Sequence, residues 1–225
     1  IENRRKIDFE NIDETIRDSA VTKLIQIAVT LGLSDEPIGR AIKIFDFNLN
    51  QAPELKEQLD LLTATSLLMA AKLEDVKCSD LCQKVRANFN GFEESDILHF
   101  ELEAFRNLNY DAIFSTAPQF LWFQLKNLCI DQEPQFDLIS HYSRVICICA
   151  LSSLQCCKYG CEKIASESIK IARDMIQNKK SIDELINTEE NELHLHTVHA
   201  MKKLNELIPS GIFDGLIQEE TEEET

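Results

Sequence analysis

Apolar residues recur every three to four positions along almost the whole chain, which is the period of an amphipathic α-helix. The first such stretch runs from about Asp13 to Leu31, with an acidic start and with Gly32 placed to close the helix. Ser34 is a candidate N-cap for a second stretch, whose apolar positions reach Leu49. The pattern therefore predicts a chain built from α-helices.

The third predicted helix, residues 59–73, differs from its neighbours because it carries no charged residue from Leu61 to Ala71. A helix that is apolar on every side lies at the centre of a helical domain. Two more helices are predicted at residues 79–89 and 93–109, followed by a linker from Ser115 to Pro118.

The second half of the chain repeats this plan. Its apolar periodicity predicts helices at residues 118–130, 136–154, 161–176, 182–186 and 189–208. We therefore predict an all-α chain of two tandem five-helix domains, residues 1–112 and 113–208. Residues 209–225 form an acidic tail that is expected to be disordered.

The amino-acid composition argues against some fold classes and some classes of partner. The chain has only 6 glycines and 5 prolines, too few turn residues for a β-sandwich or barrel. Its 23 basic and 39 acidic residues give a net charge of −16, which argues against nucleic-acid or anionic-membrane partners. No apolar run is long enough to span a membrane, and the first residues do not resemble a signal segment. Cysteines within apolar runs favour buried, reduced thiols in an intracellular protein.

The sequence shows no pattern typical of an enzyme site. It lacks a glycine-rich phosphate loop, a nucleophile elbow and a His-Glu-x-x-His pair. The candidate metal ligands are Cys156, Cys157, Cys161, His194, His196 and His199. They lack the paired short spacings of zinc sites, so we expect neither a metal nor a cofactor. These observations favour a non-catalytic binding protein.

Two charges stand in unusually apolar company. Lys72 ends the apolar third helix, and Glu101 interrupts the apolar run from Ile97 to Leu102. A charge near a core needs a partner, because desolvation costs several kcal/mol. The two could form an ion pair that closes the gap between two helices. Alternatively, both could reach a cleft where another chain supplies their partners. The residues alone favour the ion pair.

Several segments together resemble the cyclin family. Residues 40–49 (RAIKIFDFNL), 59–75 (LDLLTATSLLMAAKLED), 97–111 (ILHFELEAFRNLNYD) and 116–121 (TAPQFL) are similar to a first cyclin box. Residues 158–173 (KYGCEKIASESIKIAR) are similar to the corresponding helix of the second box in cell-cycle cyclins. The resemblance extends from about residue 12 to residue 207, and it lies in the order and spacing of the segments.

This resemblance implies two tandem five-helix cyclin boxes and a non-catalytic regulatory subunit that acts in cell-cycle progression. Its implied partner is a cyclin-dependent Ser/Thr kinase, bound as a heterodimer and activated through its αC helix. The implied location is the nucleus and the cytoplasm. Lys72 and Glu101 match the family's kinase-contacting lysine and glutamate, which reverses the preference stated above. The implied kinase-binding residues are Met69, Lys72, Leu73, Glu74, Glu101, Phe105 and Tyr110.

The family also docks substrates and inhibitors through short Arg-x-Leu peptides. The residues that match this docking patch are Ile16, Arg17, Ala20, Lys23, Leu59 and Asp60. Lys23 stands where cell-cycle cyclins carry tryptophan, Thr22 stands where they carry aspartate, and Ala20 replaces a larger side chain. A charged and less bulky surface makes a poor apolar groove, so we expect weak peptide docking.

Two other functions compete with kinase activation. One is a cyclin-fold adaptor or scaffold that activates no kinase. The other is a transcription factor of the same duplicated fold that grips DNA. The second requires basic helix surfaces, which an acidic chain lacks.

Overall fold

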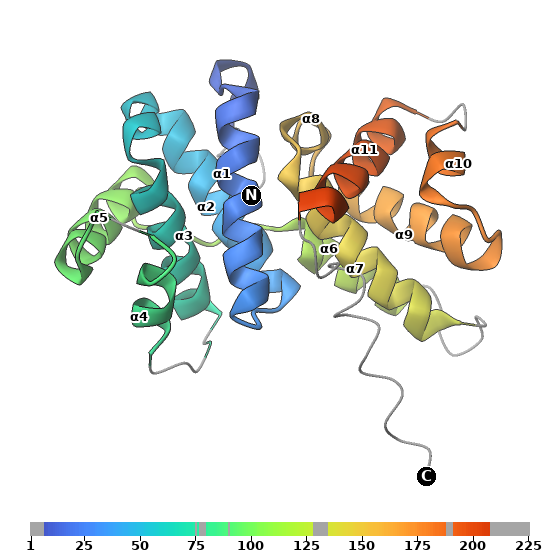
Figure 1. Cartoon of the computed structure of the whole chain (residues 1–225), viewed down its shortest axis with the longest axis horizontal. Helices are drawn as coiled ribbons and strands as arrows, with labels where there is room; N and C mark the ends of the chain where they lie inside the picture. Colours follow the sequence, from blue (N-terminus) through green and yellow to red (C-terminus); the bar gives the residue numbers. More distant parts are fainter. Residues whose placement is uncertain are drawn as a thin grey trace, which may run out of the picture. The chain divides into compact units, whose positions relative to one another are not determined.

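The computed structural model describes residues 7–74, 76, 80–89, 91–127, 135–187 and 191–207. Every regular element within these ranges is a helix (Figure 1). The chain divides into two compact units, Ile1–Thr116 and Ala117–Thr225, here called the N-terminal and C-terminal units. The sequence placed the division after residue 112. The acidic tail falls outside the described residues.

The N-terminal unit is an α-helical bundle. Its elements are η2 (Phe9–Asn11), α1 (Glu14–Thr30), α2 (Asp35–Gln51), η3 (Pro53–Gln58), α3 (Leu59–Leu73), α4 (Leu81–Arg86) and α5 (Glu94–Asn107). The helix α3 lies between α2 and α5 (Figure 1) and packs against α1, α2, α4 and α5. All its residues from Leu62 to Ala71 are buried, as the absence of charge in this stretch predicts.

Local signals fix both ends of α1. The Asp13 carboxylate accepts a hydrogen bond from the Ile16 N–H at 3.1 Å, which satisfies one unpaired donor of the first turn. Gly32 adopts a left-handed φ of +69° after the last turn. The Leu33 N–H then donates to the Ala28 carbonyl at 2.9 Å. The predicted glycine closure is present, whereas Ser34, the predicted N-cap of α2, makes no side-chain capping bond.

The C-terminal unit is a second bundle around one central helix. Its elements are α6 (Ala117–Asn127), α7 (Phe136–Ser152), α8 (Leu154–Cys157), α9 (Cys161–Gln177), α10 (Ile182–Ile186) and α11 (Glu192–Leu207). The central helix is α7, which packs against α6, α8, α9 and α11. Its residues from Val145 to Ser152 are all buried.

The structure corrects two predicted helix ranges and adds one element that was not predicted. The helix expected over residues 136–154 ends at Ser152, because Ser153 is extended (φ −98°, ψ 126°) and α8 starts afresh after it. The helix expected over 79–89 is only Leu81–Arg86. A 3-10 helix, η3, precedes α3 where no element was predicted. The predicted ends at residues 130 and 208 and the start at 189 lie outside the described residues.

Candidate functional site

Lys72 and Glu101 form an ion pair between α3 and α5. The Lys72 Nζ lies 2.7 Å from both carboxylate oxygens of Glu101. The Lys72 side chain is 57% exposed and that of Glu101 is 21% exposed. Neither charge is therefore deeply buried. The large desolvation cost that the sequence suggested for these two charges does not apply. The lysine also lies in the last turn of α3, where the helix dipole favours a cation.

The outward face of α5 carries apolar side chains beside this pair. Leu98 is 56% exposed and Leu102 is 47% exposed. With the half-buried Phe105 they follow the i, i+4, i+7 spacing of one helix face, on which Glu101 also lies. Leu73, next to Lys72, is 45% exposed. We call Lys72, Leu73, Leu98, Glu101, Leu102, Phe105 and Tyr110 the α5 surface.

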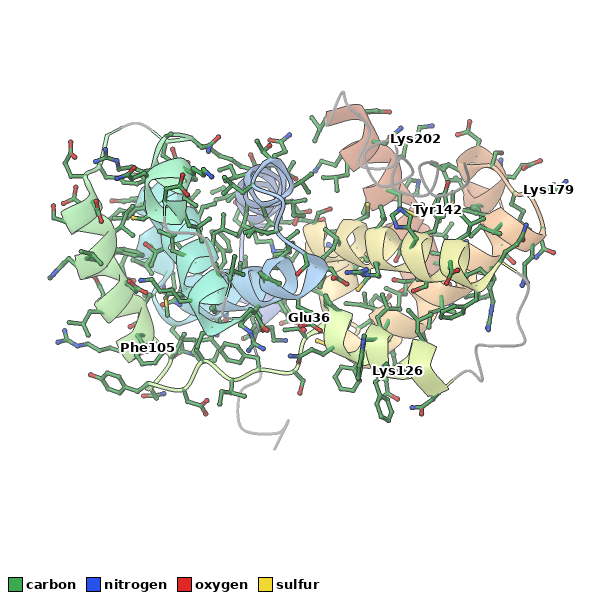
Figure 2. The ribbon with its side chains drawn as sticks, turned by 90° about the horizontal axis from the view of Figure 1, so that it is seen from below. Glu36, Phe105, Lys126, Tyr142, Lys179 and Lys202 are labelled. Carbon is green, nitrogen blue, oxygen red and sulfur yellow. The ribbon has the colours of Figure 1, made fainter. Side chains whose placement is uncertain are left out.

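Tyr110 is presented on this surface by a strained turn. Asn109 and Tyr110 follow α5 with φ angles of +51° and +58°, a left-handed region that non-glycine residues rarely occupy. The Tyr110 N–H donates to the Phe105 carbonyl at 2.9 Å. The two rings meet edge to face, with centroids 5.8 Å apart. The turn leaves the Tyr110 side chain 61% exposed, and Figure 2 shows Phe105 near the end of α5.

The Arg40 side chain links α2 to the two segments that flank Lys72 and Tyr110 of the α5 surface. It is buried on α2, and its Nε donates to the Glu74 carboxylate just after α3. Its Nη1 donates to the Ala112 carbonyl at 3.3 Å. Three segments are thereby tied together: α2, the end of α3 that carries Lys72, and the irregular segment that follows Tyr110. A charge-assisted brace of this kind fixes the spacing between Lys72 and Tyr110.

A thiol borders the site. Cys82, half-buried on α4, has its pKa raised by burial and by the nearby Glu94 carboxylate, against the opposing charge of Lys72. A raised pKa keeps a larger share of this thiol protonated at neutral pH.

The structure separates the predicted kinase-binding residues into different groups. Lys72, Leu73, Glu101, Phe105 and Tyr110 share the α5 surface. Met69 is only 3% exposed and belongs to the core beneath, so its assignment as a contact residue is corrected. Glu74 is engaged by Arg40.

Leu98 and Leu102 were missed by the sequence analysis. The buried stripe of α5 consists of Ile97, Phe100 and Ala104. A second apolar stripe on the same helix was the available signal, because one buried face needs only one stripe.

The residues of the predicted docking patch are not all on the surface. Arg17 is fully buried and Ala20 is 8% exposed, so neither lines a groove, which corrects their assignment. Arg17 instead donates from Nε and Nη2 to the two carboxylate oxygens of Asp46, each at 2.9 Å. Ile16 and Leu59 are partly exposed.

The remaining polar residues of the patch are occupied by the chain itself. The Lys23 Nζ lies 2.8 Å from the Asp60 carboxylate. It also stands 4.4 Å from the centre of the Phe89 ring. An incoming peptide would have to displace both contacts, which agrees with the expectation of weak docking.

Within the described ranges, no three His, Cys, Asp or Glu side chains are grouped so that they could hold a metal ion. His194 is buried, and its Nδ1 lies 2.8 Å from the Glu167 carboxylate. Hydrogen bonds from His194 and Asn191 outweigh the effect of burial and lower the pKa of Glu167.

None of the helices in the part of the chain that the structure describes combines the length and apolarity needed to cross a membrane.

Comparison with known proteins identifies the family of the N-terminal unit. The family model for the cyclin N-terminal domain matches residues 3–113. G2/mitotic-specific cyclin-B3 of Mus musculus is 26% identical over 196 residues, which are 86% of this chain and 13% of that protein. G2/mitotic-specific cyclin-B2 of Gallus gallus is 25% identical over 105 residues, or 47% of this chain and 26% of that protein. Cyclin-B2-2 of Oryza sativa subsp. indica is 24% identical over 196 residues, or 87% and 44%. The chain thus spans less than half the length of each of these relatives.

The fold of both units also matches a solved structure. The X-ray structure of a viral cyclin from herpesvirus saimiri aligns with a TM-score of 0.65 over 86% of this chain and 85% of that chain, at 15% identity. This likeness shows the cyclin fold. Taken with the family model and the relatives, it means that the chain belongs to the cyclin family, as a divergent member.

Proposed function

We propose that this chain is the regulatory subunit of a cyclin-dependent Ser/Thr kinase and that it binds the kinase through the α5 surface. The observation that carries the proposal is an exposed apolar helix face around a preformed Lys72–Glu101 pair. Contiguous exposed apolar surface marks interaction sites on soluble domains. Membership of the cyclin family supports a kinase as the partner.

Activation follows from which kinase conformation the surface fits. A protein kinase is active when its αC glutamate pairs with the β3 lysine that holds the ATP phosphates. A partner that binds only the inward position of αC raises the population of that state by its differential affinity. The leucine and aromatic side chains of the α5 surface provide burial, and the two charges orient the bound helix.

The ion pair leaves its charges available for a partner. Exposed pairs of this kind contribute only about 0–1 kcal/mol, because water screens them. A kinase that supplies carbonyl groups to Lys72 and N–H groups to Glu101 can therefore replace the pair at little cost. Until then, each charge keeps the other satisfied.

The binding test compares matched variants against a panel of purified cyclin-dependent kinases. We expect Lys72→Ala and Glu101→Ala to weaken binding by about tenfold each, as truncation of central interface residues does. The control is Lys202→Ala, which removes a similarly exposed lysine paired with Asp183 on the C-terminal unit. Calorimetry measures the affinities. Unchanged binding by both Lys72→Ala and Glu101→Ala would refute the assignment of these residues.

The same assay separates activation from scaffolding. Binding that leaves the rate of phosphoryl transfer unchanged would identify an adaptor rather than an activator. The relatives named as G2/mitotic-specific cyclins support a role in cell division. We further propose that the complex acts in the nucleus and the cytoplasm, which imaging of the tagged chain would test.

A further inference from the structure

The turn that carries Tyr110 is exposed, but the chain is buried immediately before and after it. Asn109, Tyr110 and Asp111 are exposed, whereas Leu108 is fully buried and Ala112 is 3% exposed. A left-handed conformation at two successive non-glycine residues is unfavourable and persists only where the surrounding structure holds it. Because the Tyr110 side chain is 61% exposed, its own burial adds little to the stability of the turn. The buried flanks are what can hold the turn in place.

Both flanks of the turn are bonded to α2. Before the turn, the Asn107 side chain donates to the Asn48 Oδ1 at 3.1 Å. After the turn, the Ala112 carbonyl accepts from the Arg40 Nη1 at 3.3 Å. The Arg40 guanidinium is itself fixed by its second bond, from Nε to the Glu74 carboxylate. Together these bonds set where the chain enters the turn and where it leaves it.

The same side of α2 contacts the chain again beyond the turn. Phe47 packs against Phe114, with ring centroids 6.0 Å apart. Arg40, Phe47 and Asn48 share one side of α2, because spacings of seven and eight residues correspond to about two helical turns. All three are buried, at 8%, 6% and 0% exposed. They therefore support the segment that carries Tyr110 and are not themselves part of the α5 surface.

We propose that Arg40 and Asn48 are positioning residues for kinase binding, which hold Tyr110 in its left-handed turn and so preset its side chain on the α5 surface. This inference rests on the proposed function, because it requires the α5 surface to be the kinase-binding site. An aromatic side chain that is already held in its binding position loses little freedom when a partner covers it. Without the two bonds from α2, the turn relaxes, and the kinase has to order it again on binding.

Amide hydrogen exchange in the free, full-length chain tests whether α2 holds the turn. Arg40→Leu and Asn48→Ala each remove one of the two bonds. We expect each variant to speed exchange of the Tyr110 amide by about tenfold, because its hydrogen bond to the Phe105 carbonyl opens more often. The control is Lys43→Leu, which removes a half-buried cation of the same helix that takes part in neither bond. Parental exchange in the core of α3 checks that each variant stays folded.

Kinase affinity tests whether this positioning matters for binding. We expect Arg40→Leu and Asn48→Ala each to weaken binding by about fivefold, although neither removes a contact residue. In a Tyr110→Ala background the same two changes should have little further effect, because the side chain that they position is gone. A general loss of stability would instead weaken binding in both backgrounds.

Two results would overturn the proposal. One is exchange of the Tyr110 amide at the parental rate in both Arg40→Leu and Asn48→Ala, whatever the kinase does. The other is parental affinity of both variants for a kinase whose binding Lys72→Ala or Glu101→Ala does weaken, in which case the proposed function stands and only the positioning role is lost. If Lys72→Ala and Glu101→Ala leave binding unchanged, the proposed function fails, and the role of Arg40 and Asn48 in binding fails with it.

Discussion

At the scale of single residues, burial decides which charges hold the fold and which remain available for binding. Arg17 has no exposed surface and bonds with Asp46 through two nitrogens. Lys72 is 57% exposed and bonds with a partner that is itself accessible. Both residues were predicted to take part in binding, Arg17 through its match to the peptide-docking patch and Lys72 through its match to the kinase-contacting lysine.

The two residues should therefore differ in their effect on stability. Arg17→Ala leaves Asp46 buried without its partner and should lower the free energy of unfolding by about 3–5 kcal/mol. Lys72→Ala breaks an exposed pair and should lower it by about 1 kcal/mol or less. Urea unfolding measures both values. If Arg17→Ala proved as mild as Lys72→Ala, Arg17 would not be the structural residue described above.

A second residue-scale prediction concerns α3. The Thr65 hydroxyl is fully buried and has no hydrogen-bond partner. A buried hydroxyl without a partner costs about 1–3 kcal/mol, so Thr65→Val should raise the free energy of unfolding by about 1 kcal/mol. The change in the free energy of unfolding can be compared with that of Thr22→Val, at a buried threonine of α1 that is 8% exposed. A destabilised Thr65→Val variant would show that the hydroxyl does find a partner.

At the scale of elements, periodicity predicts helices well and their interruptions poorly. The prediction for α3 matches at both ends, because the loss of charge at Leu61 and its return at Lys72 frame a central helix. The break before α8 was missed because Ser153 is neither glycine nor proline and the apolar run continues across it. The α5 surface was predicted in part, since five of its residues were named from the sequence but the outward-facing Leu98 and Leu102 resemble ordinary core positions.

The contact between α9 and α11 predicts a pH dependence. Glu167, 8% exposed on α9, faces His194 and Asn191 from the α11 side and Lys170 on its own helix, and its pKa lies below the ordinary value of 4.5. A carboxylate with a lowered folded-state pKa adds stability above pH 4.5, and this stability is lost as the pH falls through the folded-state pKa.

Glu167→Gln isolates this contribution from those of other carboxylates. The variant should be less stable than the parent by about 1–2 kcal/mol at pH 7, and the difference should shrink near about pH 3. Urea unfolding at the two pH values gives the comparison. A difference that is equal at both would mean that ionised Glu167 does not contribute.

At the scale of the whole molecule, each of the two units is a helical bundle around a central helix, α3 in the N-terminal unit and α7 in the C-terminal unit. The division between Thr116 and Ala117 falls within the linker that was predicted from Ser115 to Pro118. The chain has low identity to known cyclins and covers only part of their length. The proposal about its function therefore rests on its surface residues. The net charge of the chain argues against nucleic-acid partners but does not identify the actual partner, because a net charge says nothing about the position of an apolar face.

The charge does make one prediction for the intact chain. A protein that grips DNA neutralises phosphates with basic side chains, and its affinity is highest at low salt. With a net charge of −16, this chain should show no DNA binding even at about 50 mM salt in a gel-shift or anisotropy assay. Saturable binding under those conditions would revive the transcription-factor hypothesis.

The function proposed above requires the α5 surface to switch a kinase on. The most direct measurement titrates a cyclin-dependent kinase with the full chain and follows the rate of phosphoryl transfer to a Ser/Thr peptide. We predict that the rate rises and saturates with the parent chain, and that Leu102→Asp, which places a charge at the exposed centre of the surface, abolishes the rise. A kinase that binds the chain without any increase in rate, or that Leu102→Asp activates as well as the parent does, would contradict the account.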